Sequence, residues 1–115
     1  MVGSATAPDV GDLVWLSFSP QAGHEMSGRR PALVLSPRSY NEKTGLALAC
    51  PVTSRSKGYP FEVRLPAGGS VTGVVLADQV RCLDWVARRA ELASRAPPRT
   101  VGEVLSKLGV ILQRH

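Results

Sequence analysis

Two polar segments flank an apolar run in this 115-residue chain, and both carry groups suited to a phosphodiester. The first, residues 23–31, reads GHEMSGRRP, and the second, residues 51–61, reads PVTSRSKGYPF. Together they supply a carboxylate, fixed positive charge, hydroxyl groups and an aromatic ring. A small site that binds or cleaves RNA uses such groups, because it must hold phosphates, move a proton and stack bases.

Three residues of these segments could support cleavage of RNA by its own 2′-hydroxyl. The guanidinium of Arg30 can hold two phosphate oxygens and stabilise their growing charge, but it is a poor general base because it stays protonated. The hydroxyl of Thr53 can donate to a phosphate oxygen, and Glu25 is the only carboxylate in residues 19–30 and the natural base. Each residue also has an interpretation without a function: Arg30 as a surface arginine, Thr53 as a β-branched strand residue and Glu25 as a solvated loop glutamate.

Other residues could bind RNA without taking part in the chemistry. The candidates for phosphate contacts are Arg29, Arg55, Lys57, Arg88 and Arg89. The candidates for stacking on bases are Trp15 and Tyr40, although a tryptophan in a strand also suits a core. The candidates for reading base edges are Asn41, Ser54, Asp78 and Gln79. His24 could assist Glu25 or touch RNA, but a two-histidine mechanism would need the terminal His115, where chains usually fray.

Alternating and apolar patterns around these segments predict strands that position them. Residues 12–18 alternate, with Leu13 and Trp15 on one face and Val14 and Leu16 on the other. Further strands are expected at residues 31–36, 46–53, 61–65, 74–76 and 79–83, with a short helical piece within 37–45 and no assignment for 84–93. Pro51 cannot donate to a ladder, so it should mark an edge or bulge beyond which Thr53 lies free for chemistry.

The last part of the chain predicts an amphipathic helix. Thr100 and Glu103 have the spacing of a capping box. The apolar residues that follow fall on one helical stripe: Val101, Val104, Leu105, Leu108, Ile111 and Leu112. Strands first and a helix last favour an α+β, mainly β domain over residues 8–115, preceded by a disordered tail of residues 1–7.

Composition narrows the function classes. The net charge of +5 and the pI of about 9.9 favour a polyanionic partner, with RNA or DNA first, although the charges could also serve only solubility. The two cysteines are too few for a disulfide scaffold, so we expect a reduced, cytoplasmic protein with Cys50 buried and inert. No residues have metal-ligand spacing, and no segment resembles a membrane span or a secretion signal, so we expect no metal and no membrane contact.

Four blocks of the sequence resemble the MazF/PemK family of toxin endoribonucleases. They are PDVGDLVW at residues 8–15, RPALVLSP at 30–37, PVTSRSK at 51–57 and GVVLADQV at 73–80. The resemblance runs in order from Pro8 to about Trp85, and the rest of the chain is generic. By this resemblance Arg30 and Thr53 match the family's catalytic arginine and threonine, and Glu25 matches an acidic loop position that supports activity.

The resemblance implies a small SH3-like barrel of the CcdB/PemK type with short helices, used as a homodimer. Members of the family cleave single-stranded RNA at short sequences, without a metal or other cofactor, to 2′,3′-cyclic phosphate and 5′-hydroxyl ends. An antitoxin holds each toxin inactive by placing an acidic tail in the RNA groove.

Two departures from the family pattern and two alternative functions remain. Ser17 and Ser19 stand where many members carry aspartates, and Arg29 stands where a histidine often precedes the catalytic arginine. A gyrase poison such as CcdB shares the fold, but it depends on C-terminal residues unlike LQRH at residues 112–115. A non-catalytic RNA-binding module of the same fold is the other alternative.

Overall fold

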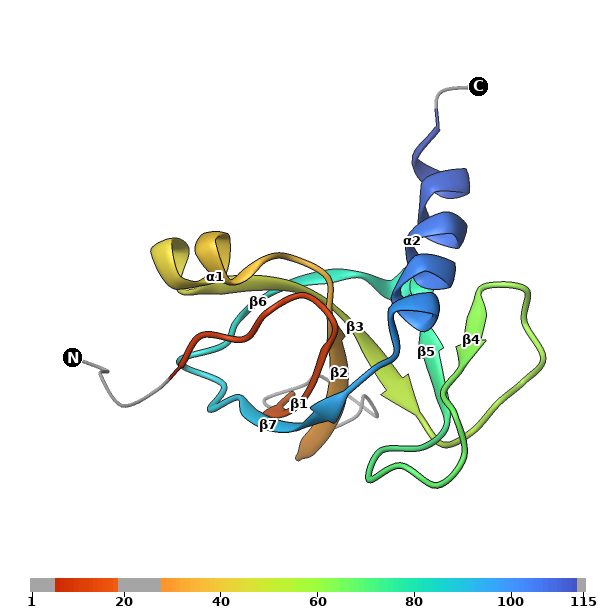
Figure 1. The fold of residues 1–115 in the computed structure, drawn as a ribbon, viewed down its shortest axis with the longest axis horizontal. Helices are drawn as coiled ribbons and strands as arrows, with labels where there is room; N and C mark the ends of the chain where they lie inside the picture. Colours follow the sequence, from red (N-terminus) through yellow and green to blue (C-terminus); the bar gives the residue numbers. More distant parts are fainter. Residues whose placement is uncertain (1–5, 19–27, 114–115) are drawn as a thin grey trace.

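The computed structural model describes residues 6–18 and 28–113 (Figure 1). Within these residues the elements, in chain order, are β1 (Asp12–Ser17), β2 (Arg29–Val34), α1 (Arg38–Thr44), β3 (Leu46–Thr53), β4 (Glu62–Arg64), β5 (Val74–Leu76), the 3₁₀ turn η2 (Ala77–Gln79), β6 (Arg81–Asp84), β7 (Glu91–Arg95) and α2 (Pro98–Leu112). The α+β, mainly β class is therefore confirmed. No helix in this part of the chain is long and apolar enough to cross a membrane.

The strands form one curved antiparallel sheet in the order β4-β5-β3-β2-β1-β7, with β6 added to the first half of β3. The order ends at β4 and β7, so the sheet does not close on itself into a barrel within the described residues. Strand β3 is central, because its residues Leu46–Ala49 pair with β6 and Val52 and Thr53 pair with β5. The prediction for Pro51 holds in part: pairing with β2 ends there, but the strand continues to Thr53.

The two faces of the sheet bury two apolar clusters. The alternation predicted for β1 is confirmed, since Leu13 lies in one cluster and Val14, Leu16 and Phe18 lie in the other. The first cluster continues into the N-terminal half of α2 through Val104, which is fully buried. Ala7 belongs to the second cluster and is 3% exposed.

The predicted ends of some elements are wrong. Helix α2 begins at Pro98, after Pro97 as N-cap, with no side-chain capping bond, because proline at the first helical position needs no amide partner. The strand expected at residues 79–83 is instead η2 followed by β6, and β7 begins in the unassigned region and extends two residues beyond it. The strand expected over residues 31–36 is Arg29–Val34.

The apolar stripe of α2 is only half buried. Val104 and Leu108 pack against the sheet, whereas the side chains of Leu105, Ile111 and Leu112 are 46%, 43% and 70% exposed. Figure 1 shows the reason, since the C-terminal half of α2 projects beyond the sheet.

Candidate active site

Strand register places Arg30 and Thr53 on one face of the sheet. Ala32 pairs with Pro51, and antiparallel partners point to the same side. Arg30 lies two residues before Ala32, and Thr53 lies two residues after Pro51, so the two-residue period of a strand brings both back to that side. They stand at the ends of β2 and β3, where pairing between the two strands has stopped.

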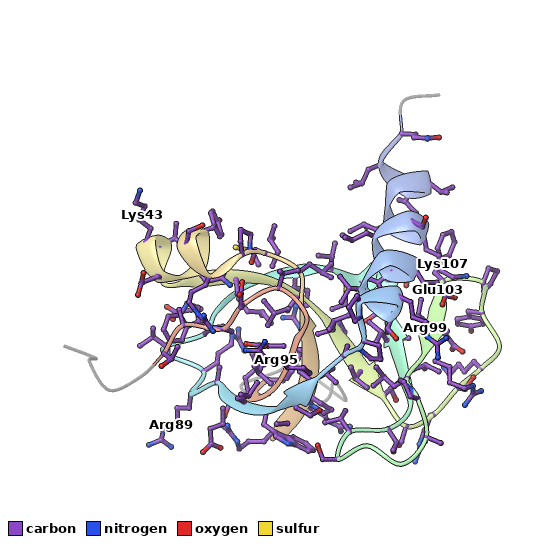
Figure 2. The ribbon with its side chains drawn as sticks, viewed as in Figure 1. Lys43, Arg89, Arg95, Arg99, Glu103 and Lys107 are labelled. Carbon is purple, nitrogen blue, oxygen red and sulfur yellow. The ribbon has the colours of Figure 1, made fainter. Side chains whose placement is uncertain are left out.

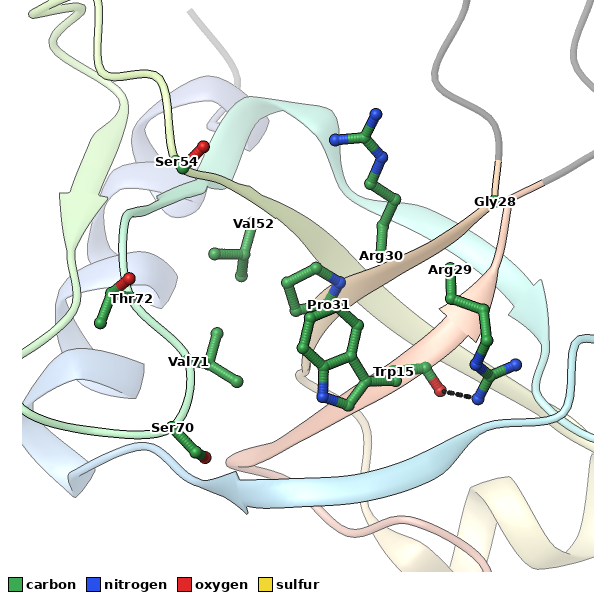
Figure 3. A pocket seen from close by; sticks show the side chains of 10 residues that line it. All are labelled: Trp15, Gly28, Arg29, Arg30, Pro31, Val52, Ser54, Ser70, Val71 and Thr72. Atoms are coloured by element: carbon green, nitrogen blue, oxygen red, sulfur yellow. Dashed lines mark hydrogen bonds between the residues drawn. The ribbon is translucent and has the colours of Figure 1, made fainter.

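A hollow of about 520 Å³ lies at this end of the sheet (Figure 3). Its lining comes from β1, β2, the end of β3 and the segment before β5: Trp15, Gly28, Arg29, Arg30, Pro31, Val52, Ser54, Ser70, Val71 and Thr72. The Trp15 side chain is 37% exposed, so it is available for stacking and is not a core residue. The hollow thus combines an aromatic surface, a hydroxyl from Ser54 and the two arginines.

The adjacent arginines have different surroundings. Arg29 is tied down, because its guanidinium donates to the backbone oxygens of Trp15 (3.1 Å) and Arg89 (2.6 Å) and to Oε1 of Glu91 (3.0 Å). Arg30 makes no hydrogen bond or ion pair with another described residue. Figure 3 shows the two side chains leaving β2 in different directions. Among the described residues, therefore, no partner occupies the donors of Arg30, while Arg29 holds β7 against β1.

Local geometry also leaves the Thr53 hydroxyl able to donate. Its oxygen accepts the backbone N–H of Arg55 at 3.1 Å, so the hydroxyl hydrogen stays available. The backbone of Gly73 lies close to the backbone of Thr53. Its φ is +112, and it has no room for a side chain, since a Cβ there would lie 2.2 Å from the Thr53 carbonyl oxygen. This close approach holds the start of β5 on the end of β3.

The prediction for Asn41 is wrong. We expected it to read a base edge, but it is fully buried in α1 and cannot meet RNA. Its Nδ2 donates to the carbonyl oxygens of Pro8 (2.8 Å) and Ser36 (2.9 Å), and its Oδ1 accepts the Ser36 hydroxyl at 2.6 Å. The Trp85 indole donates to its backbone oxygen at 2.8 Å. Asn41 therefore fastens the N-terminal segment to α1.

The other predicted residues are dispersed around the hollow. Arg55 and Lys57 are exposed on the segment after β3, and Asp78 and Gln79 are exposed on η2. None of these four residues lines the hollow. Tyr40 is exposed on α1, at the opposite side of the molecule from β4 (Figure 1). Arg88 and Arg89 precede β7, and Arg88 donates to the Ser17 carbonyl oxygen at 2.9 Å. Glu25 and His24 lie outside the described residues.

The structure brings one further cation to the face of Arg30 and Thr53. Arg81 pairs with Ala49, whose side chain lies in the same cluster as Ala32 and Phe18. Its guanidinium carbon is 5.4 Å from the centre of the Phe18 ring, a cation–π distance. The sequence placed Arg81 inside the strand expected at residues 79–83, but the face on which its side chain lies depends on the pairing of β6 with β3.

Within the described part of the chain, neither Cys50 nor a cluster of potential metal ligands forms a second centre. Burial raises the pKa of the Cys50 thiol to about 12, so this cysteine is an inert core residue as predicted. Among residues 6–18 and 28–113, no three His, Cys, Asp or Glu side chains gather as metal ligands would.

Comparison with known proteins identifies the class to which this chain belongs. The family model for the PemK-like, MazF-like toxin of type II toxin-antitoxin systems matches residues 9–112, and the chain belongs to this family. It is 47% identical over 109 residues to the endoribonuclease toxin MazF of Escherichia coli K12, covering 95% of this chain and 97% of that protein. It is 42% identical to the Escherichia coli endoribonuclease PemK over 86% of this chain and 78% of PemK.

Solved structures agree with the sequence relatives. MazF from Deinococcus radiodurans superimposes with a TM-score of 0.88 at 64% identity, over 94% of this chain and 98% of that one. A MazE–MazF structure from the same organism gives the same TM-score and identity, over 94% and 97% of the two chains.

Proposed function

We propose that this chain is an endoribonuclease toxin that cleaves single-stranded RNA at selected sequences without a metal. The observation that carries the proposal is the guanidinium of Arg30, which has no partner among the described residues and lies on the same sheet face as the hydroxyl of Thr53. Arg30 also lines the hollow that contains Trp15. Family membership and the endoribonuclease relatives support the same reaction. Neither a gyrase poison nor a non-catalytic RNA-binding module requires this pair to stay free.

In the proposed mechanism the RNA supplies its own nucleophile. The 2′-oxygen attacks the adjacent phosphorus, and the bond from phosphorus to the 5′-oxygen breaks, which leaves a 2′,3′-cyclic phosphate and a 5′-hydroxyl. Glu25 takes the proton of the 2′-hydroxyl, and Arg30 stabilises the charge on the phosphate oxygens and donates a proton to the departing 5′-oxygen, which it regains from solvent. Thr53 donates to a non-bridging oxygen and fixes the phosphate. Each step uses side chains alone.

Binding of the RNA strand is assigned to the residues around this centre. We infer stacking on Trp15 and phosphate contacts by Arg55 and Lys57, all of which are exposed. Ser54, Asp78 and Gln79 are exposed candidates for reading base edges, and His24 is a further candidate contact. Arg29 supports this surface indirectly, because its bonds to β1 and β7 position Trp15.

We also propose that the toxin acts in the cytoplasm as a homodimer and is inhibited by an acidic antitoxin. The exposed apolar side chains of Leu105, Val110 and Leu112 on α2 support association with a second copy. The net charge of +5 suits an acidic tail, and the Deinococcus relative was solved with MazE. Leu112→Asp should shift the purified chain toward the monomer in analytical ultracentrifugation, and an unchanged dimer would remove this end of α2 from the interface.

The deciding experiment incubates the purified chain with a long single-stranded RNA in EDTA and maps the ends by sequencing. We expect discrete cuts with cyclic-phosphate ends. Arg30→Ala should lower the rate by about 10²–10³-fold, the cost of removing one transition-state donor, while RNA binding persists. Lys43→Ala is the control, because this cation lies on α1 (Figure 2), which contributes no residue to the lining of the hollow. Intact RNA with a folded protein would overturn the proposal and turn attention to gyrase binding.

A further inference from the structure

The segment between β3 and β4 is irregular in backbone but tightly held by one carboxylate. Glu62, the first residue of β4, accepts the backbone N–H of Lys57 at 2.9 Å, the backbone N–H of Gly58 at 3.1 Å and the hydroxyl of Ser56 at 2.7 Å. These hydrogen bonds lower the pKa of the carboxyl, with the Lys57 amide as the largest cause. The segment is therefore bound back onto the strand that follows it.

The far end of this segment is anchored to α2 as well. The Lys107 ammonium donates to the carbonyl oxygen of Pro60, and the Glu62 amide donates to the carbonyl oxygen of Tyr59 at 3.1 Å. Figure 2 shows Lys107 on α2 beside the segment. Both ends of the turn are thus fixed by hydrogen bonds, so the residues between them are presented in one conformation.

This anchoring leaves an aromatic ring in solvent. Tyr59 is 60% exposed, and the Lys57 ammonium lies 6.0 Å from the centre of its ring. An exposed ring with a cation beside it is the combination that single-stranded nucleic acids use, because bases stack on the ring and the cation meets a phosphate. A tyrosine that served only packing would lie against the sheet.

The position of Tyr59 connects it to the candidate active site. The segment starts at Ser54, which lines the hollow, and reaches Tyr59 five residues later, at most about 18 Å away. Arg55 and Lys57 lie between them, and the carboxylate of Glu62 is directed at the backbone rather than at solvent cations. The path from hollow to ring is therefore cationic.

We propose that Tyr59 is a second stacking site, which holds an unpaired base of the RNA strand on one side of the cleaved bond. Lys57 contacts the neighbouring phosphate, and Glu62 is a positioning residue that keeps the ring in place. This proposal rests on the proposed RNA-cleaving function. An acidic protein segment would use the two cations but would not depend on the ring.

The test compares Tyr59→Ala and Tyr59→Phe with wild type on a random-sequence single-stranded RNA pool. For Tyr59→Ala we expect KM to rise roughly 5- to 100-fold, the equivalent of losing one stacked base, with kcat unchanged. The base preference at one position beside the cut should weaken. Tyr59→Phe keeps the ring and should behave as wild type. Tyr40→Ala is the control: it also removes an exposed tyrosine, but from α1, which lines no part of the hollow and lies on the opposite side of the molecule from β4, so we no longer count Tyr40 as a stacking residue.

An unchanged KM and cut pattern in Tyr59→Ala would overturn the proposal. Equal losses in Tyr59→Ala and Tyr59→Phe would also overturn it, because they would implicate the hydroxyl and not stacking. If wild type leaves the pool intact, the proposed function fails, and anisotropy with a labelled single-stranded RNA then tests the stacking site alone. There too, equal Kd values for wild type and Tyr59→Ala would reject it.

Glu62→Gln tests the positioning role separately. An amide in place of the carboxylate puts an N–H group against the amides of Lys57 or Gly58, so the segment should loosen. We expect KM to rise about 2- to 10-fold through the cost of ordering the ring on binding, with Tm and kcat near wild type. Glu103→Gln, on the exposed side of α2, is the matched control (Figure 2). An unchanged KM would remove Glu62 from the proposal.

Discussion

Polar side chains organise both ends of β3, but they are buried at the first end and partly exposed at the other. At the first end, the Ser36 hydroxyl accepts the Leu48 amide at 2.9 Å and donates to the fully buried Asn41. At the other end, the partly exposed Glu62 gathers two amides and a hydroxyl from the segment that follows Thr53. Asn41 and Glu62 both form hydrogen bonds with backbone groups that have no partner in a strand.

Burial decides what each arrangement does. Around Asn41 a lost bond leaves polar atoms without water, so the arrangement stabilises the fold. Around Glu62 water can replace any lost bond, so the arrangement adds little stability and mainly selects one conformation. The groups of Arg30, Thr53 and Tyr59 that we propose bind RNA all belong to this second, exposed end. Stability and the proposed ligand binding are thus separated along a single strand.

The substitution Asn41→Ala tests this separation and has the largest expected effect on stability. The substitution leaves the Pro8 and Ser36 carbonyls and the Ser36 hydroxyl without their partner in a buried place, and we expect a loss of about 4 kcal/mol. Urea unfolding measures the free energy of unfolding. RNA cleavage per folded molecule should stay near wild type. A specific loss of cleavage with normal stability would contradict the structural role.

At the other end of β3 we expect a smaller loss of stability together with a loss of function. Gly73→Ala would place a Cβ 2.2 Å from the Thr53 carbonyl oxygen at φ +112, which should cost about 3 kcal/mol and displace Thr53. Gly68→Ala is the control, because it has φ +90 but nothing within 4 Å, and should cost only about 1 kcal/mol. Equal losses of stability and of cleavage in the two variants would show that close packing behind Thr53 is unimportant.

Local pattern was enough to predict some of these features. Strand β3 was predicted with its observed bounds, because a continuous apolar run follows Gly45 and ends at polar residues. The alternation of β1 was also predicted, with Leu13 in one apolar cluster and Val14 and Leu16 in the other. Such features depend on neighbours in the chain, and these are visible in a sequence.

Other features depend on contacts distant in sequence. Asn41 reads as a polar residue on a short helix, and its burial appears only when residues 8, 36 and 85 meet around it. Arg29 looks equivalent to Arg30 until β7 supplies Glu91 as its partner. Glu62 looks like a solvated residue in an alternating strand, since its bonds depend on the path of the chain between β3 and β4.

The smallest expected effect is a pH dependence that the hydrogen bonds to Glu62 show and those around Asn41 do not. Hydrogen bonds from the Lys57 amide, the Ser56 hydroxyl and the Gly58 amide lower the pKa of Glu62. Since the folded pKa lies below the ordinary value of 4.5, the bonds are fully present above that value and are lost as pH falls through the folded pKa. NMR titration should therefore shift the amide resonances of Lys57 and Gly58 together in acid.

At the first end of β3, the Leu48 amide donates to a hydroxyl that does not titrate, and its resonance should not follow this transition. Glu62→Gln should abolish the joint shift of the Lys57 and Gly58 amides, whereas Glu103→Gln should preserve it. A joint shift that persists in Glu62→Gln would mean that another group orders the segment, and Glu62 would then lose its part in presenting Tyr59.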